Sequence, residues 1–310
     1  MSQVVNNFKT SPTDFGLKCQ FEAMASHCEI VVNDLSMAFS DMEAIAKNCA
    51  QEIKRIEKKY SRYDTDSILS RINAASGVHA QAIDQETFEL LQFSGELYKT
   101  SQGLFDITSG VLRRAWDFKK GMPPTNAQIE ELLALVGWSR VEYDPKQIFL
   151  QYKGMEIDFG GFGKEYAADR ASKILLEAHI KSGYVNLAGD IRVIGPKING
   201  DPWLMGIQNP RDASKLIASI PIHSGALTTS GDYERFFISN GKRYCHIIRP
   251  DTGQPVNHWQ SVSVLAPLAI VAGSCSTIAM LMQQEGLAHL NQSGFSFLAI
   301  DNDGQFHSQS

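Results

Sequence analysis

The sequence lacks the features that mark several common classes of protein. No stretch approaches the roughly 18 consecutive apolar residues of a membrane span, and the N-terminal segment has no apolar core of a signal peptide. Basic runs are also absent, and the formal net charge is -5, so we expect no nucleic-acid partner. The sequence therefore predicts a cytoplasmic protein without a membrane or nucleic-acid partner.

Cysteine and the common catalytic signatures are scarce as well. The five cysteines are scattered and contain no C-x-x-C pair, which argues against a disulfide framework and a zinc knuckle. The chain has no G-x-S-x-G, H-E-x-x-H or G-x-G-x-x-G motif, so a serine hydrolase, a zinc protease and a Rossmann dehydrogenase have no local support. Any active site must combine residues that are dispersed along the chain.

The patterns that are present predict one α+β domain. The chain has 310 residues, of which 43% are hydrophobic, so it can bury a large core. Apolar residues at helical spacing predict helices at 36–60, 85–100, 125–135, 163–182 and 272–284. Strand-like segments lie at 28–33, 147–152, 155–159, 184–187, 193–194, 203–207, 216–220, 261–266 and 295–301. With no linker or repeat visible, we expect a flexible segment at 1–20 and a single domain with a mixed, largely antiparallel sheet at 21–310.

The stretch 224–253 is dense in small residues and hydroxyls. Its Asn240-Gly241 step predicts a hairpin between two short strands, because both residues accept positive φ angles. This prediction places His246 on a strand, just before a polar turn. A lone strand histidine is more often structural than catalytic, so the local pattern alone does not assign it a function.

A glycine-rich turn at 160–164 leads into a predicted helix. The residues Gly160-Gly161-Phe162-Gly163-Lys164 would let backbone amides approach an anion at a helix N-terminus. The segment is not a Walker loop, since Glu165 stands where that motif has Ser or Thr. A phosphate cradle and a tight turn without a ligand are equally good interpretations of this segment by itself.

Taken together and in order, several patches resemble the ApbE family of flavin transferases, over roughly residues 21–280. The patches are SRYDTDSILSRIN, GLFDITSGVLRRAWDF, IDFGGFGKEYAADR, YVNLAGDIRVIG, SGALTTSGDYERFF, RYCHIIRPDTGQPV and SVSVLAPLAIVAGSCSTIAM. The resemblance implies an ApbE-like fold with an FAD cleft. It also implies transfer of FMN from FAD to a Thr or Ser hydroxyl of an acceptor flavoprotein, with release of AMP.

The resemblance also implies which residues form the site. His246 and Lys164 take catalytic roles, with His246 helping to accept a proton and Lys164 neutralising phosphate charge. Residues 228–231 correspond to a turn beside the cofactor. The implied cofactor-binding residues are Met24, Tyr63, Asp106, Gly160, Gly161, Lys164, Asn186, Gly189, Asp190, Thr229, Ser230, Gly231, His246 and Ile247.

The implied metal site departs from the family pattern. Gly273, in AGSCST, stands where the family carries a metal-binding aspartate. The Gly163 carbonyl and the Thr277 hydroxyl remain as ligands for Mg²⁺, which normally also takes a carboxylate. Alternative sources of that carboxylate are Asp158, Asp190 and Asp251.

Two further departures are milder. Arg249 and Asp251 exchange places relative to the family, which could preserve a local ion pair, and Met24-Ala25-Ser26 replaces Met-Gly-Thr. Because the metal site is altered, three functions stay open: an FMN transferase, an FAD pyrophosphatase that uses water as acceptor, and a non-catalytic FAD-binding protein.

Overall fold

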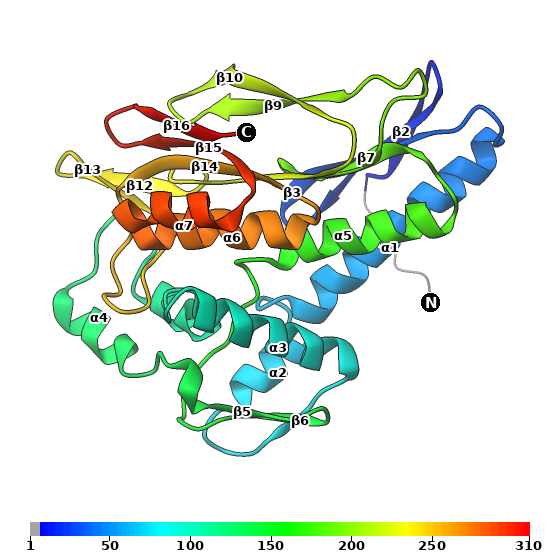
Figure 1. Ribbon diagram of the computed structural model, residues 1–310. Coiled ribbons are helices and arrows are strands. Elements are labelled where there is room, and N and C mark those ends of the chain that lie inside the picture. The colour runs from blue at the N-terminus through cyan, green and yellow to red at the C-terminus, as the bar shows by residue number, and fades with distance from the viewer. Residues whose placement is uncertain (1–6) are drawn as a thin grey trace.

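A nine-stranded sheet lies at the centre of the protein (Figure 1). The computed structural model describes residues 7–310, and every pairing it records between neighbouring strands of this sheet is antiparallel. Along the sheet the strands are β1 (Lys9–Thr13), β2 (Gly16–Ala23), β3 (Ser26–Asn33), β7 (Ser182–Leu187), β8 (Asp190–Gly195), β11 (Gly225–Gly231), β14 (Trp259–Ala266), β15 (Ser296–Asp301) and β16 (Phe306–Gln309). The predicted α+β class with a largely antiparallel sheet is confirmed.

Helices cover one face of the sheet and a two-stranded ribbon covers the other (Figure 1). The helices are α1 (Phe39–Tyr60), α5 (Gly163–Glu177), α6 (Ala269–Met282) and α7 (Gly286–Ser293), with a 3-10 turn at Gln283–Glu285. The ribbon consists of β9 (Trp203–Asn209) and β10 (Asp212–Ile222). Met205 and Ile207 of β9 pack against Ile191 and Val193 of β8. Burial of these apolar faces from both sides holds the sheet in a three-layer arrangement.

Residues between α1 and α5 form a smaller lobe below the helical layer (Figure 1). The lobe contains α2 (Ile68–Ala74), β4 (Gln81–Ala82), α3 (Gln85–Thr100), a 3-10 helix η1 (Ile107–Arg114), α4 (Asn126–Leu133), a 3-10 turn at Trp138–Arg140, β5 (Val141–Tyr143) and β6 (Gln147–Leu150). One cluster of buried apolar side chains includes Leu91 and Ile148 of the lobe together with Val264 of β14 and Ile278 of α6. The lobe and the sheet therefore share a core.

Side-chain caps begin several helices. The Thr125 hydroxyl accepts a hydrogen bond from the Gln128 backbone N–H, and the Gln128 side chain accepts one from the Thr125 backbone N–H, which completes a capping box. The Ser67 hydroxyl caps α2 through the Ser70 N–H. The expected hairpin at 240–241 is also present: β12 (Phe236–Ser239) pairs with β13 (Lys242–Cys245), and both turn residues have positive φ.

Three predictions about the fold are wrong. The sheet begins before residue 21, since β1 and β2 are paired and the side chains of Leu17 and Cys19 are fully buried; residues 1–6 of the expected flexible segment lie outside the described residues. Residues 155–159 form no strand, because the lobe satisfies their backbone through Asn73 and Ile107. The helix α5 ends at Glu177, since the chain reverses through His179 at a φ of 61°.

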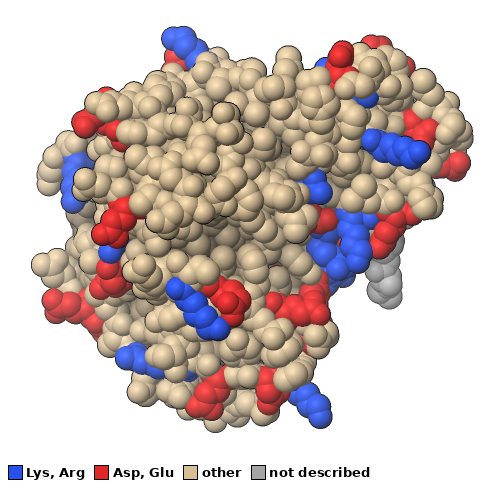
Figure 2. Space-filling view, viewed as in Figure 1, with Lys and Arg blue, Asp and Glu red and all other residues tan. Residues whose placement is uncertain are grey.

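Charged side chains lie unevenly on the surface. On the face drawn in Figure 2, acidic and basic side chains form small mixed groups, mostly around a broad uncharged area. Within residues 7–310, no helix combines the length and the apolar character that crossing a bilayer requires.

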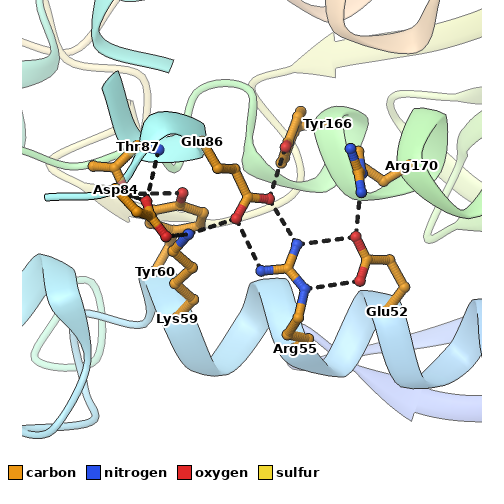
Figure 3. A network of polar contacts seen from close by, with 9 residues as sticks. All are labelled: Glu52, Arg55, Lys59, Tyr60, Asp84, Glu86, Thr87, Tyr166 and Arg170. Carbon is orange, nitrogen blue, oxygen red and sulfur yellow. Dashed lines mark hydrogen bonds and ion pairs between the residues drawn. The ribbon is translucent and has the colours of Figure 1, made fainter. Parts of the chain in front are cut away.

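A polar network joins the lobe to the helical layer (Figure 3). Arg55 on α1 donates to Glu52 on its own helix and to Glu86 on α3. From α5, the Tyr166 hydroxyl donates to Glu86 at 2.8 Å and the Arg170 guanidinium donates to Glu52 at 3.1 Å. Three helices are thereby held by one set of charge-assisted hydrogen bonds.

We predict that Glu86→Gln lowers stability in a pH-dependent way. Burial alone would raise the pKa of Glu86, but hydrogen bonds from Arg55, Lys59 and Tyr166 outweigh it and lower the pKa to about 2. Because the pKa of Glu86 is lower in the folded state, its ionised carboxylate stabilises the protein at pH values above 4.5, the pKa in the unfolded chain. This stabilisation is lost as the pH falls from 4.5 towards 2. With solvent screening of this partly exposed carboxylate discounted, we expect a loss of about 1 to 2 kcal/mol at pH 7.

Urea denaturation at pH 7, 5, 4 and 3 measures this effect. The difference between wild type and Glu86→Gln should shrink as the pH falls, while the exposed Glu89→Gln on the same helix should match wild type throughout. A pH-independent difference would contradict the assignment of the effect to the Glu86 charge.

The turn between β2 and β3 contains two residues that have left-handed backbone conformations although neither is glycine. Ala23 pairs with Ser26, and the two residues between them, Met24 and Ala25, have φ angles of 52° and 57°. Such a two-residue turn requires positive φ at both positions, where a Cβ atom meets the following carbonyl oxygen. Ala25, the position at which the family resemblance implies glycine, is therefore strained.

We predict that Ala25→Gly stabilises the protein by about 0.5 to 1 kcal/mol. Relief of left-handed strain of about 1 to 2 kcal/mol exceeds the entropic advantage of alanine, which is about 0.4 to 1 kcal/mol. Thermal and urea unfolding provide the measurement. Ala44→Gly, at an exposed position of α1, is the matched control and should destabilise by about 1 kcal/mol. Equal losses in both variants would show that the turn carries no strain.

Candidate functional site

Turns of the central sheet gather at the end where α5 begins. The β7–β8 turn consists of Ala188 and Gly189, and the pairing of β3 with β7 brings the Met24–Ala25 turn to the same end. Strand β11 runs towards this end as well, since Leu227 pairs with Ile191, next to Asp190. The predicted residues of β7, β8 and β11 are thus neighbours in the fold.

The glycine-rich segment before α5 has a split role. A Cβ atom at Gly161 would lie 2.8 Å from the Phe105 ring, and Phe105 stacks on the fully buried Phe162, so Gly161 is required for packing. In contrast, a Cβ atom at Gly163 would meet nothing within 4 Å. The tight-turn interpretation therefore explains Gly161, while Gly163 leaves open space at the first turn of a helix.

Lys164 links α5 to the sheet. Its amine lies 2.8 Å from a carboxylate oxygen of Asp190, whose residue is only 4% exposed. Burial alone would lower the pKa of Lys164, but the negative charges of Asp190 and Glu165 raise it, so the amine stays charged. A Cβ atom at Gly189 would also meet nothing within 4 Å. A fixed cation thus lies between two open glycine positions, an arrangement suited to a phosphate.

Glu165, the next residue of α5, is a buried carboxyl group. The residue is 8% exposed, and its Oε2 atom has no hydrogen-bond partner. Burial, with a smaller contribution from the charge of Asp190, raises the pKa of Glu165 to about 8. Its side chain lies against Gly273 of α6, where a Cβ atom would be 2.6 Å from Glu165 Oε1.

Hydroxyl groups from β11 and α6 form a small cluster beside Gly273. The Ser230 hydroxyl lies 2.8 Å from that of Ser276 and 3.0 Å from that of Thr277. The Ser276 hydroxyl also donates to the Gly273 carbonyl at 3.0 Å. Thr229 faces the neighbouring strand, with its hydroxyl 2.8 Å from that of Ser263. Ser230 and Thr277, predicted from different parts of the chain, are brought into direct contact.

His246 lies just beyond the end of β13, and not on the strand as predicted. Its backbone N–H donates to the Arg235 carbonyl, which extends the hairpin pairing by one residue. The Nδ1 atom is buried without a partner. Burial, with repulsion from Arg235 and Arg113, lowers the pKa of His246 to about 4, so the ring is neutral at physiological pH.

Arginines that the sequence analysis did not single out surround this region. Arg113 and Arg62 share one carboxylate, Asp158, at 2.6 and 3.2 Å. Arg235 adds a further positive charge near His246. Cations outnumber the carboxylate in this cluster, which favours an anionic ligand. Arginine is common in sequences and these three are far apart along the chain, so no local pattern identifies them.

Several predicted residues have roles within the protein itself. Both carboxylate oxygens of Asp106 accept hydrogen bonds, from Thr108 and from the Trp138 N–H, so this buried side chain caps η1. Residues 228–231 belong to strand β11 and not to a turn, which follows Gly231. Gly231 makes room for the ring of Tyr233, which a Cβ atom would approach to 2.3 Å.

The remaining predicted residues differ in how many of their polar or aromatic groups are already engaged in contacts within the protein. The Tyr63 ring is 79% exposed and rests on the Arg62 guanidinium, so it is available to a planar ligand. Asn186 accepts a hydrogen bond from the Gly189 N–H and so supports the β7–β8 turn. The Met24 N–H donates to Glu57 of α1, and the Ile247 carbonyl accepts from Val256. Gly160 donates its N–H to Asp158.

The three aspartates considered as substitutes for a residue at 273 are all paired with cations. Asp158 contacts two arginines and Asp190 contacts Lys164. Asp251 accepts a bidentate hydrogen bond from Arg249 at 2.6 and 2.9 Å, so the exchange of these two residues does preserve an ion pair. The carboxyl group beside Gly273 is that of Glu165, which sequence reasoning missed. Only the packing of α5 on α6 brings these positions together.

Two surface hollows, of about 440 and 500 Å³, lie away from these residues. The first is lined by Arg192, Ser224 and Phe295, at the opposite end of β11, and the second by Arg55, Lys59 and Asp84 at the polar network. Neither contains a predicted site residue. The candidate site is therefore defined by converging charges and hydroxyls and not by these hollows.

Comparisons with known proteins give consistent results. A model of the ApbE family matches residues 24–298. An FAD:protein FMN transferase of Klebsiella pneumoniae (strain 342) is 32% identical over 261 residues, covering 82% of this chain and 81% of the relative. An FAD:protein FMN transferase of Haemophilus influenzae is 28% identical over 272 residues, covering 83% and 79%.

Solved structures agree with the sequence matches. The crystal structure of the ApbE protein from Thermotoga maritima superposes with a TM-score of 0.87 at 30% identity, covering 98% of this chain and 97% of that one. The apo form of the flavinyl transferase ApbE from Pseudomonas stutzeri gives a TM-score of 0.83 at 25% identity, covering 98% and 95%. Matches of sequence and fold thus extend over most of the chain, and this protein belongs to the ApbE family.

Proposed function

We propose that this protein transfers FMN from FAD to a threonine or serine hydroxyl of an acceptor flavoprotein and releases AMP. The main support is the match to relatives named FAD:protein FMN transferase over 82% and 83% of this chain. The geometry agrees, since a fixed lysine, an arginine cluster and a neutral histidine suit a phosphate-containing substrate.

The reaction exchanges a phosphoanhydride bond of FAD for a phosphoester bond to the acceptor. The acceptor hydroxyl oxygen attacks the phosphorus on the FMN side of the pyrophosphate, and the bond from that phosphorus to the bridging oxygen breaks. AMP leaves with the bridging oxygen, and the proton of the hydroxyl passes to His246. Because charge is spread over the phosphate oxygens, positioning and charge neutralisation supply most of the catalysis.

The chain's own residues have distinct tasks in this scheme. Lys164, oriented by Asp190, neutralises charge on the pyrophosphate next to the open faces of Gly163 and Gly189. His246 is neutral at physiological pH and so can accept a proton. The exposed ring of Tyr63 provides a stacking surface for the flavin or the adenine.

Magnesium is the metal that the family resemblance implies. The hydroxyl of Thr277 and the carbonyl of Gly163 would hold it, and a bound Mg²⁺ would supply positive charge to the phosphates. The residues present fit a cation, because the buried Glu165 Oε2 lies in this region without a hydrogen-bond partner.

The proposed reaction is tested by incubating the protein with FAD and Mg²⁺, with and without an acceptor flavoprotein. We expect AMP release that depends on the acceptor, together with flavin that stays on the acceptor after denaturation. AMP release without an acceptor would instead identify an FAD pyrophosphatase, and FAD binding without AMP would identify a binding protein; each result would refute the transfer.

We predict that His246→Ala lowers kcat/KM for transfer by about 10² to 10⁴, the usual contribution of a general base. The Kd for FAD should change by less than about threefold, because the proton moves only during the reaction. Since kcat/KM reports the free protein, and its His246 has a pKa of about 4, the wild-type profile should show no loss from this residue between pH 8 and 5.5. His258→Ala, at a histidine outside the site, is the control. A break near pH 6.5 that disappears in His246→Ala would contradict the lowered pKa.

A further inference from the structure

Glu165 has a free carboxylate oxygen in a position where water has little access. The residue is 8% exposed, and Oε2 has no hydrogen-bond partner among the described residues. The charged groups that face it are Lys164, Asp190 and Asp169. The Lys164 amine is 2.8 Å from Asp190, so the nearest cation is already committed to another carboxylate. Burying a carboxyl oxygen without a hydrogen-bond partner costs free energy. A bound ligand that contacts Glu165 Oε2 would offset this cost.

The carboxyl group fills the space in front of Gly273. A Cβ atom at Gly273 would lie 2.6 Å from Glu165 Oε1, 2.7 Å from Cγ and 2.9 Å from Cδ. No side chain fits there while Glu165 keeps its position. Glu165 on α5 therefore occupies the place into which a side chain from position 273 of α6 would extend.

Hard oxygen atoms lie along the same face of α6. Gly273 and Thr277 are four residues apart, one turn of the helix, so groups at these positions are neighbours. The Thr277 hydroxyl contacts that of Ser230 at 3.0 Å, and Ser276 joins the same cluster. Carboxylate, hydroxyl and carbonyl oxygens are the ligands that Mg²⁺ prefers.

We propose that Glu165 supplies the carboxylate ligand of a Mg²⁺ site in this protein, taking the place of a side chain at Gly273 and acting with Thr277 and the Gly163 carbonyl. The inference rests on the proposed function for the identity of the metal. In this arrangement the metal-binding carboxylate comes from α5 and not from α6. The carboxylate missing at position 273 is replaced by the one at position 165. Within residues 7–310, no three His, Cys, Asp or Glu side chains gather as a metal cluster, so hydroxyl and carbonyl oxygens would have to complete the coordination begun by Glu165.

Metal binding tests the inference without reference to turnover. Mn²⁺ serves as the probe, measured by electron paramagnetic resonance on the full chain, alone and with FAD, in competition with Mg²⁺. We expect one Mn²⁺ per wild-type chain and at least about tenfold weaker binding in Glu165→Gln, since losing a ligand costs no less than losing a supporting residue. Glu177→Gln, at an exposed position near the other end of α5, is the matched control and should bind like wild type.

Exchanging the two positions gives an independent test if Glu165→Gln folds poorly. Gly273→Asp alone should weaken Mn²⁺ binding and lower the melting temperature, because the new side chain displaces Glu165. Glu165→Gly combined with Gly273→Asp should restore Mn²⁺ binding to within about threefold of wild type. A gain of binding in Gly273→Asp alone would overturn the inference.

The outcomes separate this inference from the proposed function. Equal Mn²⁺ binding by wild type and Glu165→Gln, or no binding by wild type with or without FAD, refutes the role of Glu165. Binding that depends on Glu165 without transfer of flavin to any acceptor supports the metal site and refutes the transferase. Flavin transfer that is unaffected in Glu165→Gln supports the transferase and refutes the site.

Discussion

The polar network centred on Glu86 determines where α5 lies, and the candidate site depends on that position. Tyr166 and Arg170, two and six residues after Lys164 on α5, bind this network. Those first residues, Lys164 and Glu165, then extend from a helix that cannot shift along its axis without breaking hydrogen bonds to charged groups. Placement of the site therefore originates in contacts that lie outside it.

The first turn of α5 carries two neighbouring ionisable residues, Lys164 and Glu165, whose side chains contact different parts of the protein. Lys164 turns towards the sheet and pairs with Asp190, while Glu165 turns towards α6 and meets Gly273. Consecutive helical residues point in directions about 100° apart, so a single turn can serve both neighbours. A substitution at Gly273 on α6 would consequently displace Glu165 on α5, so the effect of a change on one helix depends on the other.

Much of the fold, and part of the site, follows from local sequence patterns. Periodicity predicts α3 and α4, and Asn240-Gly241 predicts the hairpin before His246. Strand β1 is missed because it is polar and mostly exposed, so its pairing leaves no apolar alternation. Strand β2 does carry that alternation, with Leu17, Cys19, Phe21 and Ala23 buried, and its signal is overlooked. The family resemblance implies both Lys164 and Asp190, but the contact of Glu165 with Gly273 depends on helix packing, which no local pattern encodes.

The histidine and the lysine of the site are carried by parts of the protein with different attachments. His246 follows a two-stranded hairpin that is not part of the central sheet, and this hairpin is anchored by Phe237 and Tyr244 stacked near Trp116 of the lobe. Lys164 is fixed by the helical layer and the sheet. In the proposed mechanism, the spacing between the proton acceptor and the phosphate-binding cation therefore depends on an aromatic stack that contains neither of them, and a substitution in that stack would change the spacing without altering His246 or Lys164.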